Sequence, residues 1–260
     1  MLMAVNVGNT QTKLGVFDGD ELLARWRMTT ESHRTADELG ASITSFMELR
    51  DVRLSEVDAM IIASDVPDLS RSYRELGKEM LSIPFYSVTS ELKTGLANRY
   101  DDPNAVGSDR IVNAVAAKEL YGSPAIIVDF GTATTVCAVD GDGAYRGGAI
   151  MPGIYVSLDA LIAHAAKLSG VDLEEQETSA IATNTPDSIR SGFVYGYAGA
   201  IDSLIRRFRE ELAEKSSSNP RVIATGGPAS AIVRHCQEIE KLDADLTLKG
   251  LCLLHAMNKH

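Results

Sequence analysis

The chain has 260 residues, of which 45% are hydrophobic and 23% are charged, and its formal net charge is -11. This composition predicts a globular protein with a sizeable core, in one large or two smaller domains. The negative charge argues against a broad surface for nucleic acid or anionic membrane. No apolar run approaches the roughly 20 residues of a membrane helix, and no secretory signal is evident. Three widely spaced cysteines form neither a metal motif nor a disulfide framework, which predicts a cytoplasmic location.

The first part of the chain is predicted to begin with a three-stranded meander at 2–7, 12–17 and 22–28. The sequence from Thr35 to Glu38 is a capping box and predicts the start of a helix. The elements expected after it are a strand at 58–64, a helix at 69–81, a strand at 84–88, a polar loop at 92–107 and a helix at 108–120.

The second part repeats the same pattern. Strands are expected at 125–129, 134–140, 144–150 and 221–225, and helices at 155–168 and 187–215. Strand-rich units that alternate with helices indicate an α/β fold. Because the meander occurs twice, we expect two similar α/β halves, at 1–117 and 118–260, with a cleft between them.

A glycine turn rich in hydroxyl groups follows the first strand of each meander. The first copy is Asn6–Lys13 and the second is Asp129–Thr135. Backbone N–H groups and hydroxyls at such turns can hold phosphate oxygens, so two copies could grip one polyphosphate from both sides. Asp129 at a strand end also suits a hard cation. The alternatives are an ordinary β-turn for the first copy and a capped turn for the second.

The residues Gly107-Ser108-Asp109-Arg110 occupy a predicted helix start. The helix dipole there favours an ionised Asp109, which could accept a proton from a substrate hydroxyl. Arg110 could hold a substrate carboxylate by a bidentate contact. The alternative is a capped helix with an exposed ion pair.

In combination these motifs resemble those of the type III pantothenate kinases, a family of the actin-like, sugar-kinase and Hsp70 ATPase superfamily. The resemblance extends over essentially the whole chain and implies two actin-like (ribonuclease H-like) domains. The matching segments are Asn6–Lys13 (D-x-G-N-T-x-T-K), Gly107–Arg110 (G-A-D-R), Asp129–Thr135 (D-F-G-T-A-T-T), Gly147–Gly153 (G-G-A-I-x-P-G), Asn184-Thr185 with Ser191-Gly192 (N-T…S-G), Thr225–Gly227 (T-G-G) and Leu246–Leu251 (L-T-L-K-G-L).

The resemblance implies ATP-dependent phosphorylation of pantothenate to 4'-phosphopantothenate, the first step of coenzyme A biosynthesis. Asp109 would be the proton acceptor, and Asp129 would bind a monovalent cation, K⁺ or NH₄⁺. Pantothenate would contact Tyr100, Gly107, Ser108, Asp109, Arg110 and Thr185. ATP, accompanied by Mg²⁺, would contact Asn6, Val7, Gly8, Asn9, Thr10, Gln11, Thr12, Lys13 and Thr132. The family is dimeric, and the glycine-spaced helix at 187–215 is our candidate for part of a homodimer interface.

Ser108 stands in place of the Ala of the G-A-D-R motif, and two further positions depart from the family pattern. Asn6 replaces the acidic residue of the first motif, and Cys137 stands where the family often has Asp. Three hypotheses follow. The first is a pantothenate kinase, slowed by Asn6. The second is a non-catalytic or weakly active homologue that binds a ligand or partner in a regulatory role. The third is another actin-like phosphotransferase such as a sugar kinase, which the short chain and Gly107–Arg110 oppose.

Overall fold

The computed structural model forms two compact α/β units. It describes residues 1–164, 171–173, 179–213 and 218–259. The first unit comprises Met1–Leu96, Tyr100–Ala116 and Asp245–His260, and the second comprises Ala97–Arg99 and Ala117–Ala244. The sequence suggested two uninterrupted segments, 1–117 and 118–260. In the structure the chain returns to the first unit because its last helix packs against the first sheet.

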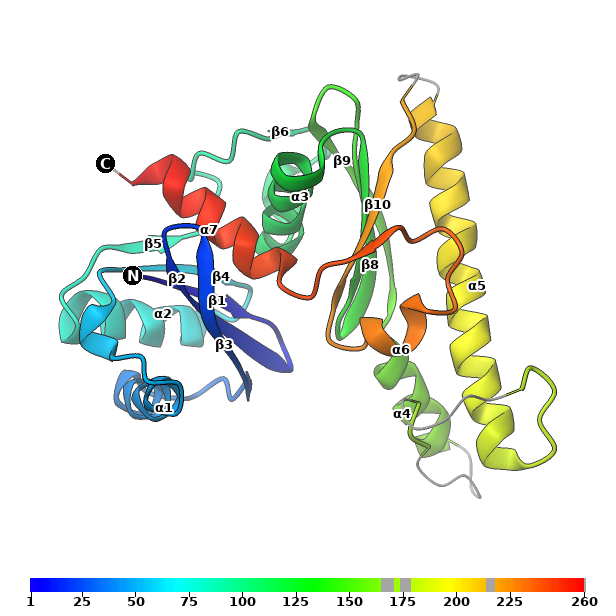
Figure 1. The fold of residues 1–260 in the computed structure, drawn as a ribbon, viewed down its shortest axis with the longest axis horizontal. Coiled ribbons are helices and arrows are strands. Elements are labelled where there is room, and N and C mark those ends of the chain that lie inside the picture. The colour runs from blue at the N-terminus through cyan, green and yellow to red at the C-terminus, as the bar shows by residue number, and fades with distance from the viewer. Residues whose placement is uncertain (165–170, 174–178, 214–217, 260) are drawn as a thin grey trace. The chain divides into compact units, whose positions relative to one another are not determined.

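The first unit is built on a five-stranded mixed sheet in the order β3-β2-β1-β4-β5 (Figure 1). Strand β1 pairs antiparallel with β2 and parallel with β4. Its strands are β1 (Leu2–Val7), β2 (Gln11–Asp18), β3 (Glu21–Thr29), β4 (Ala59–Ser64) and β5 (Phe85–Ser87). Its helices are α1 (Ala36–Glu48), α2 (Pro67–Glu75), the start of α3 (Ser108–Tyr121) and α7 (Leu246–Asn258), with short helical turns at Leu54–Glu56, Leu76–Met80 and Pro103–Ala105.

The side-chain alternation of β1 divides this sheet into two faces. Met3, Val5 and Val7 join the apolar cluster that α1 and α2 complete. The opposite face is covered by α7, whose Leu248 side chain lies 3.1 Å from the position a Cβ would take on Gly15 of β2. Asn6 belongs to this second face, because it alternates with the residues that face α1 and α2.

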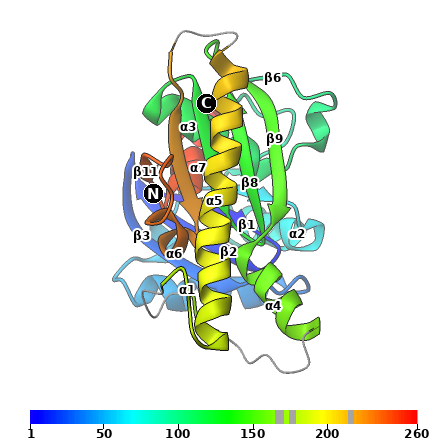
Figure 2. The same ribbon diagram turned by 90° about the vertical axis from the view of Figure 1, so that its right-hand side faces the viewer.

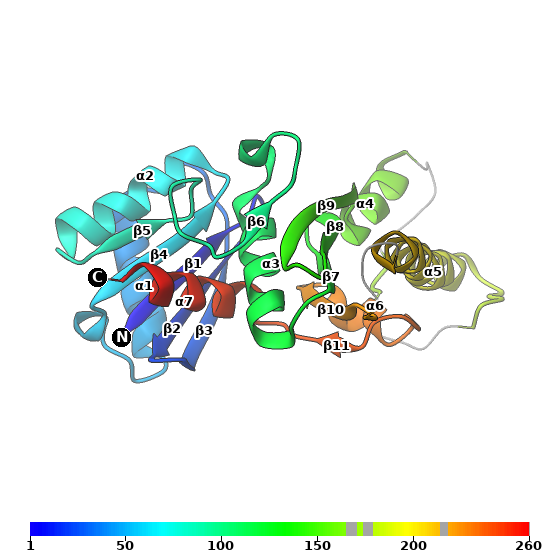
Figure 3. The same cartoon turned by 90° about the horizontal axis from the view of Figure 1, so that it is seen from above.

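The second unit repeats this topology. Its sheet has the order β11-β10-β7-β8-β9-β6, in which β7 pairs antiparallel with β8 and parallel with β10. The strands are β6 (Ala97–Asn98), β7 (Ala125–Phe130), β8 (Ala133–Val139), β9 (Ala144–Pro152), β10 (Arg221–Gly226) and β11 (Lys241–Leu242), and the helices are α4 (Ile154–His164), α5 (Thr185–Ala213) and α6 (Ala229–Val233). Helices α4, α5 and α6 lie on one side of its sheet (Figure 3).

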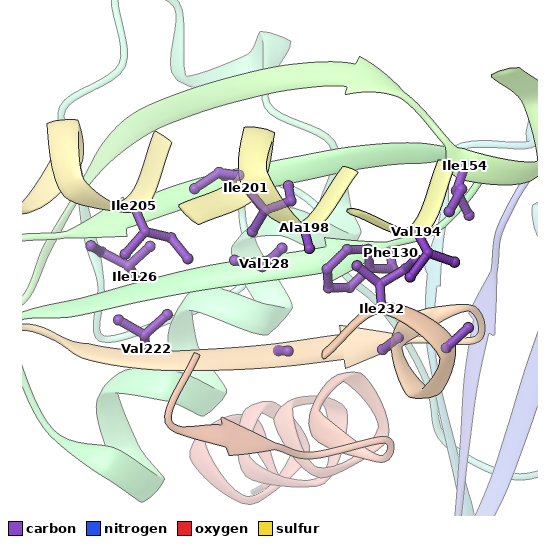
Figure 4. Packing of buried hydrophobic residues seen from close by; sticks show 14 of the residues in the cluster. Ile126, Val128, Phe130, Ile154, Val194, Ala198, Ile201, Ile205, Val222 and Ile232 are labelled. Carbon is purple, nitrogen blue, oxygen red and sulfur yellow. The ribbon is translucent and has the colours of Figure 1, made fainter. Parts of the chain in front are cut away.

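The core of the second unit is the layer between its sheet and helix α5. The long helix runs along the sheet (Figure 2), and its Val194, Ala198, Ile201 and Ile205 point toward β7 (Figure 4). The side chains that β7 contributes are Ile126, Val128 and Phe130. All seven are at most 3% exposed, so this apolar layer holds β7 rigidly behind the turn that follows it.

Most elements expected from the sequence are confirmed, including both meanders and the Thr35–Glu38 capping box. The helix expected at 69–81 is α2 followed by a π-helical turn at Leu76–Met80. Strands β6 and β11 were not expected, because two-residue strands have no periodicity. The expected helix ends at 165–168 and 214–215 lie outside the described residues. In the described part of the chain no helix is long and apolar enough to cross a membrane.

Candidate active site

The turn between β1 and β2 is closed by hydrogen bonds from the end of β3. Within the turn, the Gly8 amide donates to the carbonyl of Gln11 at 3.1 Å. Thr30 donates its amide to the carbonyl of Thr10 at 2.9 Å and its hydroxyl to the carbonyl of Gly8 at 2.7 Å. The Thr12 and Thr30 hydroxyls are 2.9 Å apart, and because the Thr30 proton is already used, Thr12 is the donor. The turn is therefore pre-formed, with Asn9 and Thr10 exposed.

Asn6 is the penultimate residue of β1 and is half-buried. It lies directly opposite Lys13 of β2 and Ala63 of β4. Directly opposed residues project from the same face of a sheet. The side chains of Asn6 and Lys13 therefore leave the sheet from the same face beneath the first turn.

Asp129 occupies the equivalent place in the second unit, as the penultimate and half-buried residue of β7. It lies opposite Thr135 of β8 and Thr225 of β10. The Thr225 hydroxyl oxygen is buried and has no hydrogen-bond partner among the described residues. A carboxylate beside such a buried oxygen fits a hard cation, which takes oxygen ligands.

Two glycines allow the backbone around the second turn to pack closely. A Cβ on Gly153 would lie 2.3 Å from the carbonyl oxygen of Gly131 and 2.4 Å from that of Thr132. Gly226 has φ +104°, and a Cβ there would lie 2.2 Å from the carbonyl oxygen of Phe130. Any larger residue at these positions would require a backbone shift. Glycine therefore allows the neighbouring backbone segments to pack this closely around the turn. Thr132 itself is exposed.

The start of α3 carries the proposed base and a buried arginine. Asp109 is half-buried, and its Oδ1 accepts a hydrogen bond from the Arg110 amide at 2.7 Å. Arg110 is 7% exposed, and its guanidinium carbon lies 5.8 Å from the centre of the Tyr100 ring, within the distance of a cation–π contact. Farther along the helix, Asn113 accepts a hydrogen bond of 2.7 Å from Thr247 of α7, which fixes α3 to the rest of the first unit.

Asp65 is a neighbour of this helix start that the motifs did not reveal. Its Oδ1 accepts hydrogen bonds from the amide of Ser108 at 3.3 Å and from the Ser108 hydroxyl at 3.2 Å. Thr30 was also missed, and Thr225 was quoted only as part of the T-G-G segment, without a role at the site. Asp65 and Thr30 directly follow β4 and β3, and Thr225 is the penultimate residue of β10, so a polar residue at or near a strand end was the available signal.

Thr185 is the first residue of α5 and is exposed. Asn184 before it caps the helix, since its Oδ1 accepts a hydrogen bond from the Asp187 amide at 3.0 Å. In the same unit, Cys137 is buried in β8, and the Tyr145 hydroxyl donates to its Sγ at 3.5 Å.

The candidate residues thus fall into two sets. The first unit contains Asn6–Lys13, Tyr100 and Gly107–Arg110, and the second contains Asp129, Thr132 and Thr185. Except for Tyr100, which lies in the loop before the turn at Pro103–Ala105, these residues lie at a strand end, in the turn that follows a strand, or at a helix start of their own unit.

The model of the type III pantothenate kinase family matches residues 2–207. The type III pantothenate kinase of Rubrobacter xylanophilus is 63% identical over 259 residues, which are 99% of this chain and 98% of that protein. The chain belongs to the type III pantothenate kinase family.

Solved structures agree with this membership at the level of fold. A Campylobacter jejuni protein assigned to the Baf family of transcriptional activators has a TM-score of 0.60 and 16% identity, with 98% of each chain covered. The ADPNP-bound activator of 2-hydroxyisocaproyl-CoA dehydratase from Clostridium difficile has a TM-score of 0.51 and 13% identity, with 99% of this chain and 94% of that chain covered. The duplicated sheet topology is that of the actin-like ATPase fold, as expected from the sequence.

Proposed function

We propose that this protein transfers the γ-phosphoryl group of ATP to the terminal hydroxyl of pantothenate, giving 4'-phosphopantothenate for coenzyme A biosynthesis. The observation that carries the proposal is the start of α3, where Asp109, Arg110 and Tyr100 lie together in a chain of this family. A sugar kinase needs no such arginine-bearing helix start to hold a carboxylate.

Asp109 acts as the proton acceptor for the pantothenate hydroxyl. Its carboxylate is half-buried in the first turn of α3, where the helix dipole stabilises the ionised form. The transition state of phosphoryl transfer is loose, so bonding to the attacking oxygen is weak and its proton need not be removed before the transfer. A carboxylate within hydrogen-bond reach of the hydroxyl can therefore accept the proton as it leaves.

Arg110 and Tyr100 bind pantothenate, together with Gly107, Ser108 and Thr185. Pantothenate carries a carboxylate, and arginine binds carboxylates with two parallel hydrogen bonds. The Tyr100 ring beside the Arg110 guanidinium orients that group. The arginine side chain therefore loses less conformational entropy when pantothenate binds.

ATP contacts the two glycine turns, through Asn6–Lys13 in one unit and Thr132 in the other. The exposed Asn9 and Thr10 side chains and the backbone N–H groups of the first turn suit phosphate oxygens. Lys13 adds a positive charge on the same strand pair. Magnesium accompanies ATP and neutralises the charge that develops on the phosphates.

A monovalent cation, K⁺ or NH₄⁺, binds at Asp129. The buried Thr225 hydroxyl opposite Asp129 supports this assignment, because a bound cation would give that oxygen the partner that the protein does not supply.

The active form is proposed to be a cytoplasmic homodimer, with α5 as part of the interface. Among the described residues, a Cβ on Gly192, Gly196 or Gly199 would have no neighbour within 4 Å, so another backbone could approach this side of the helix closely. Tyr195, on the same stretch, is 38% exposed.

The test is pantothenate-dependent ADP release with magnesium, with and without potassium, in the parent protein and in Asn6→Asp. Turnover in the parent supports the proposal, and turnover only in the variant locates the defect at Asn6. If neither protein releases ADP in a pantothenate-dependent way, a ligand-binding or regulatory homologue is favoured. Turnover with sugars in place of pantothenate would favour the third hypothesis.

A further inference from the structure

Helix α3 begins without a cap of its own. The residue before it is Gly107, which has no side chain to accept hydrogen bonds from the first turn. Helix starts normally carry Ser, Thr, Asp or Asn at this place, because the first N–H groups have no partner within the helix. Within the first turn the Asp109 carboxylate accepts the Arg110 amide, whereas the amide of Ser108 takes its acceptor from another part of the chain.

Asp65 is that acceptor, 43 residues earlier in the sequence. Its Oδ1 accepts both the amide and the hydroxyl of Ser108. It directly follows β4, whose Ser64 is registered with Val7 of the buried strand β1. The bend at Asp65 is fixed by a hydrogen bond of 3.1 Å from the Val66 amide to the Ser64 hydroxyl. Asp65 is itself exposed, but it directly follows a buried inner strand of the first sheet.

The other oxygen of Asp65 and the carboxylate of Asp109 both lie close to Gly107. A Cβ on Gly107 would lie 3.1 Å from Oδ2 of Asp65 and 2.9 Å from Oδ1 of Asp109. Both carboxylates therefore face the same backbone position from two different elements. Any side chain at Gly107 would displace them.

We propose that Asp65 is a positioning residue, which caps α3 and thereby holds the Asp109 carboxylate in its reactive place. This inference rests on the proposed role of Asp109 as the base. Ser108 strengthens the link, because the family motif has Ala at this position and only a serine supplies the second hydrogen bond.

The experiment compares Asp65→Ala, Asp65→Asn and Ser108→Ala with the parent protein. Asp68→Asn is the matched control, since Asp68 follows three residues later, is exposed, and has its carboxylate 3.9 Å from Nδ1 of His33. Two quantities are measured: kcat with the KM for ATP, and amide hydrogen exchange of the peptide 105–112. Melting temperatures verify that every variant is folded.

We expect Asp65→Ala to lower kcat roughly 10- to 100-fold, because a small misplacement of a catalytic group has an effect of this size. Its KM for ATP should stay within about twofold, and exchange in 105–112 should accelerate. Asp65→Asn keeps an acceptor oxygen, and Ser108→Ala keeps the contact between Asp65 and the amide of residue 108. Each of these variants should therefore lower kcat less than Asp65→Ala does. Asp65→Ala should also have a smaller effect in the Ser108→Ala background, because the two residues share one contact.

An unchanged kcat, or unchanged exchange in 105–112, would overturn the inference. An Asp68→Asn variant that lost as much kcat as Asp65→Ala would overturn it as well. If neither the parent nor Asn6→Asp phosphorylates pantothenate, the proposed function fails on its own. Hydrogen exchange then still decides whether Asp65 caps α3.

Discussion

Replacing Asn6 by aspartate tests how the first turn handles the magnesium–phosphate group. Asn6 is half-buried at the end of β1, with Lys13 directly opposite on β2, so the new carboxylate would project from the same face as a cation. The strand pairs on both sides fix its position, and the substitution changes charge with almost no change in shape. The effect on turnover should therefore be electrostatic.

We expect Asn6→Asp to raise kcat/KM for ATP roughly 10- to 100-fold, the range for a group that orients a metal-bound water. This corresponds to about 1.4–2.7 kcal/mol of transition-state stabilisation. The magnesium concentration for half-maximal rate should fall with it, because the carboxylate favours the cation. The assay is coupled ADP release over a magnesium titration at saturating pantothenate.

Asn9→Asp is the matched control, because it adds the same charge on the exposed turn, away from the strand pair. It should raise the KM for ATP by repelling phosphate and should leave the magnesium dependence unchanged. If Asn6→Asp gives the parent rate and the parent magnesium dependence, position 6 has no part in placing the cation. If Asn9→Asp gives the same gain, the effect is not specific to position 6.

Three further outcomes are expected. Asp109→Asn should lower transfer by about 10²–10⁴-fold, while ATP binding measured by calorimetry stays near the parent value; near-full turnover would mean that Asp109 is not the base. Gly226→Ala should lower the free energy of unfolding by roughly 2–4 kcal/mol, because of its positive φ and the Phe130 carbonyl 2.2 Å from the new Cβ, and equal denaturation midpoints would contradict this. Burial raises the pKa of Cys236 to about 12 and that of Cys252 to about 11, from an ordinary value of 9.0. As the pH rises, the thiols of the unfolded chain therefore lose their protons before those of the folded protein. The stability that comes from keeping these thiols protonated is complete below about pH 9 and declines as the pH rises toward the folded pKa values. Denaturant titrations at about pH 8 and about pH 10 would measure the decline.

Local patterns in the sequence were sufficient to predict the duplicated elements of this fold. The alternation in β1 and β2, the capping box at Thr35 and the turn at Gly8 are each decided by neighbours within a few residues. The helix start at Ser108 was predicted for the same reason, together with its candidate base.

The tertiary structure alone decided which distant residues support these motifs. Thr30 closes the first turn from 22 residues away, Asp65 caps α3, and Thr225 lies opposite Asp129 across a parallel strand pair. The return of α7 to the first sheet could not be predicted either, because its mostly apolar residues do not specify which apolar surface they cover. Periodicity and capping report only on residues that are close in the chain, whereas these contacts depend on the order of the strands in each sheet.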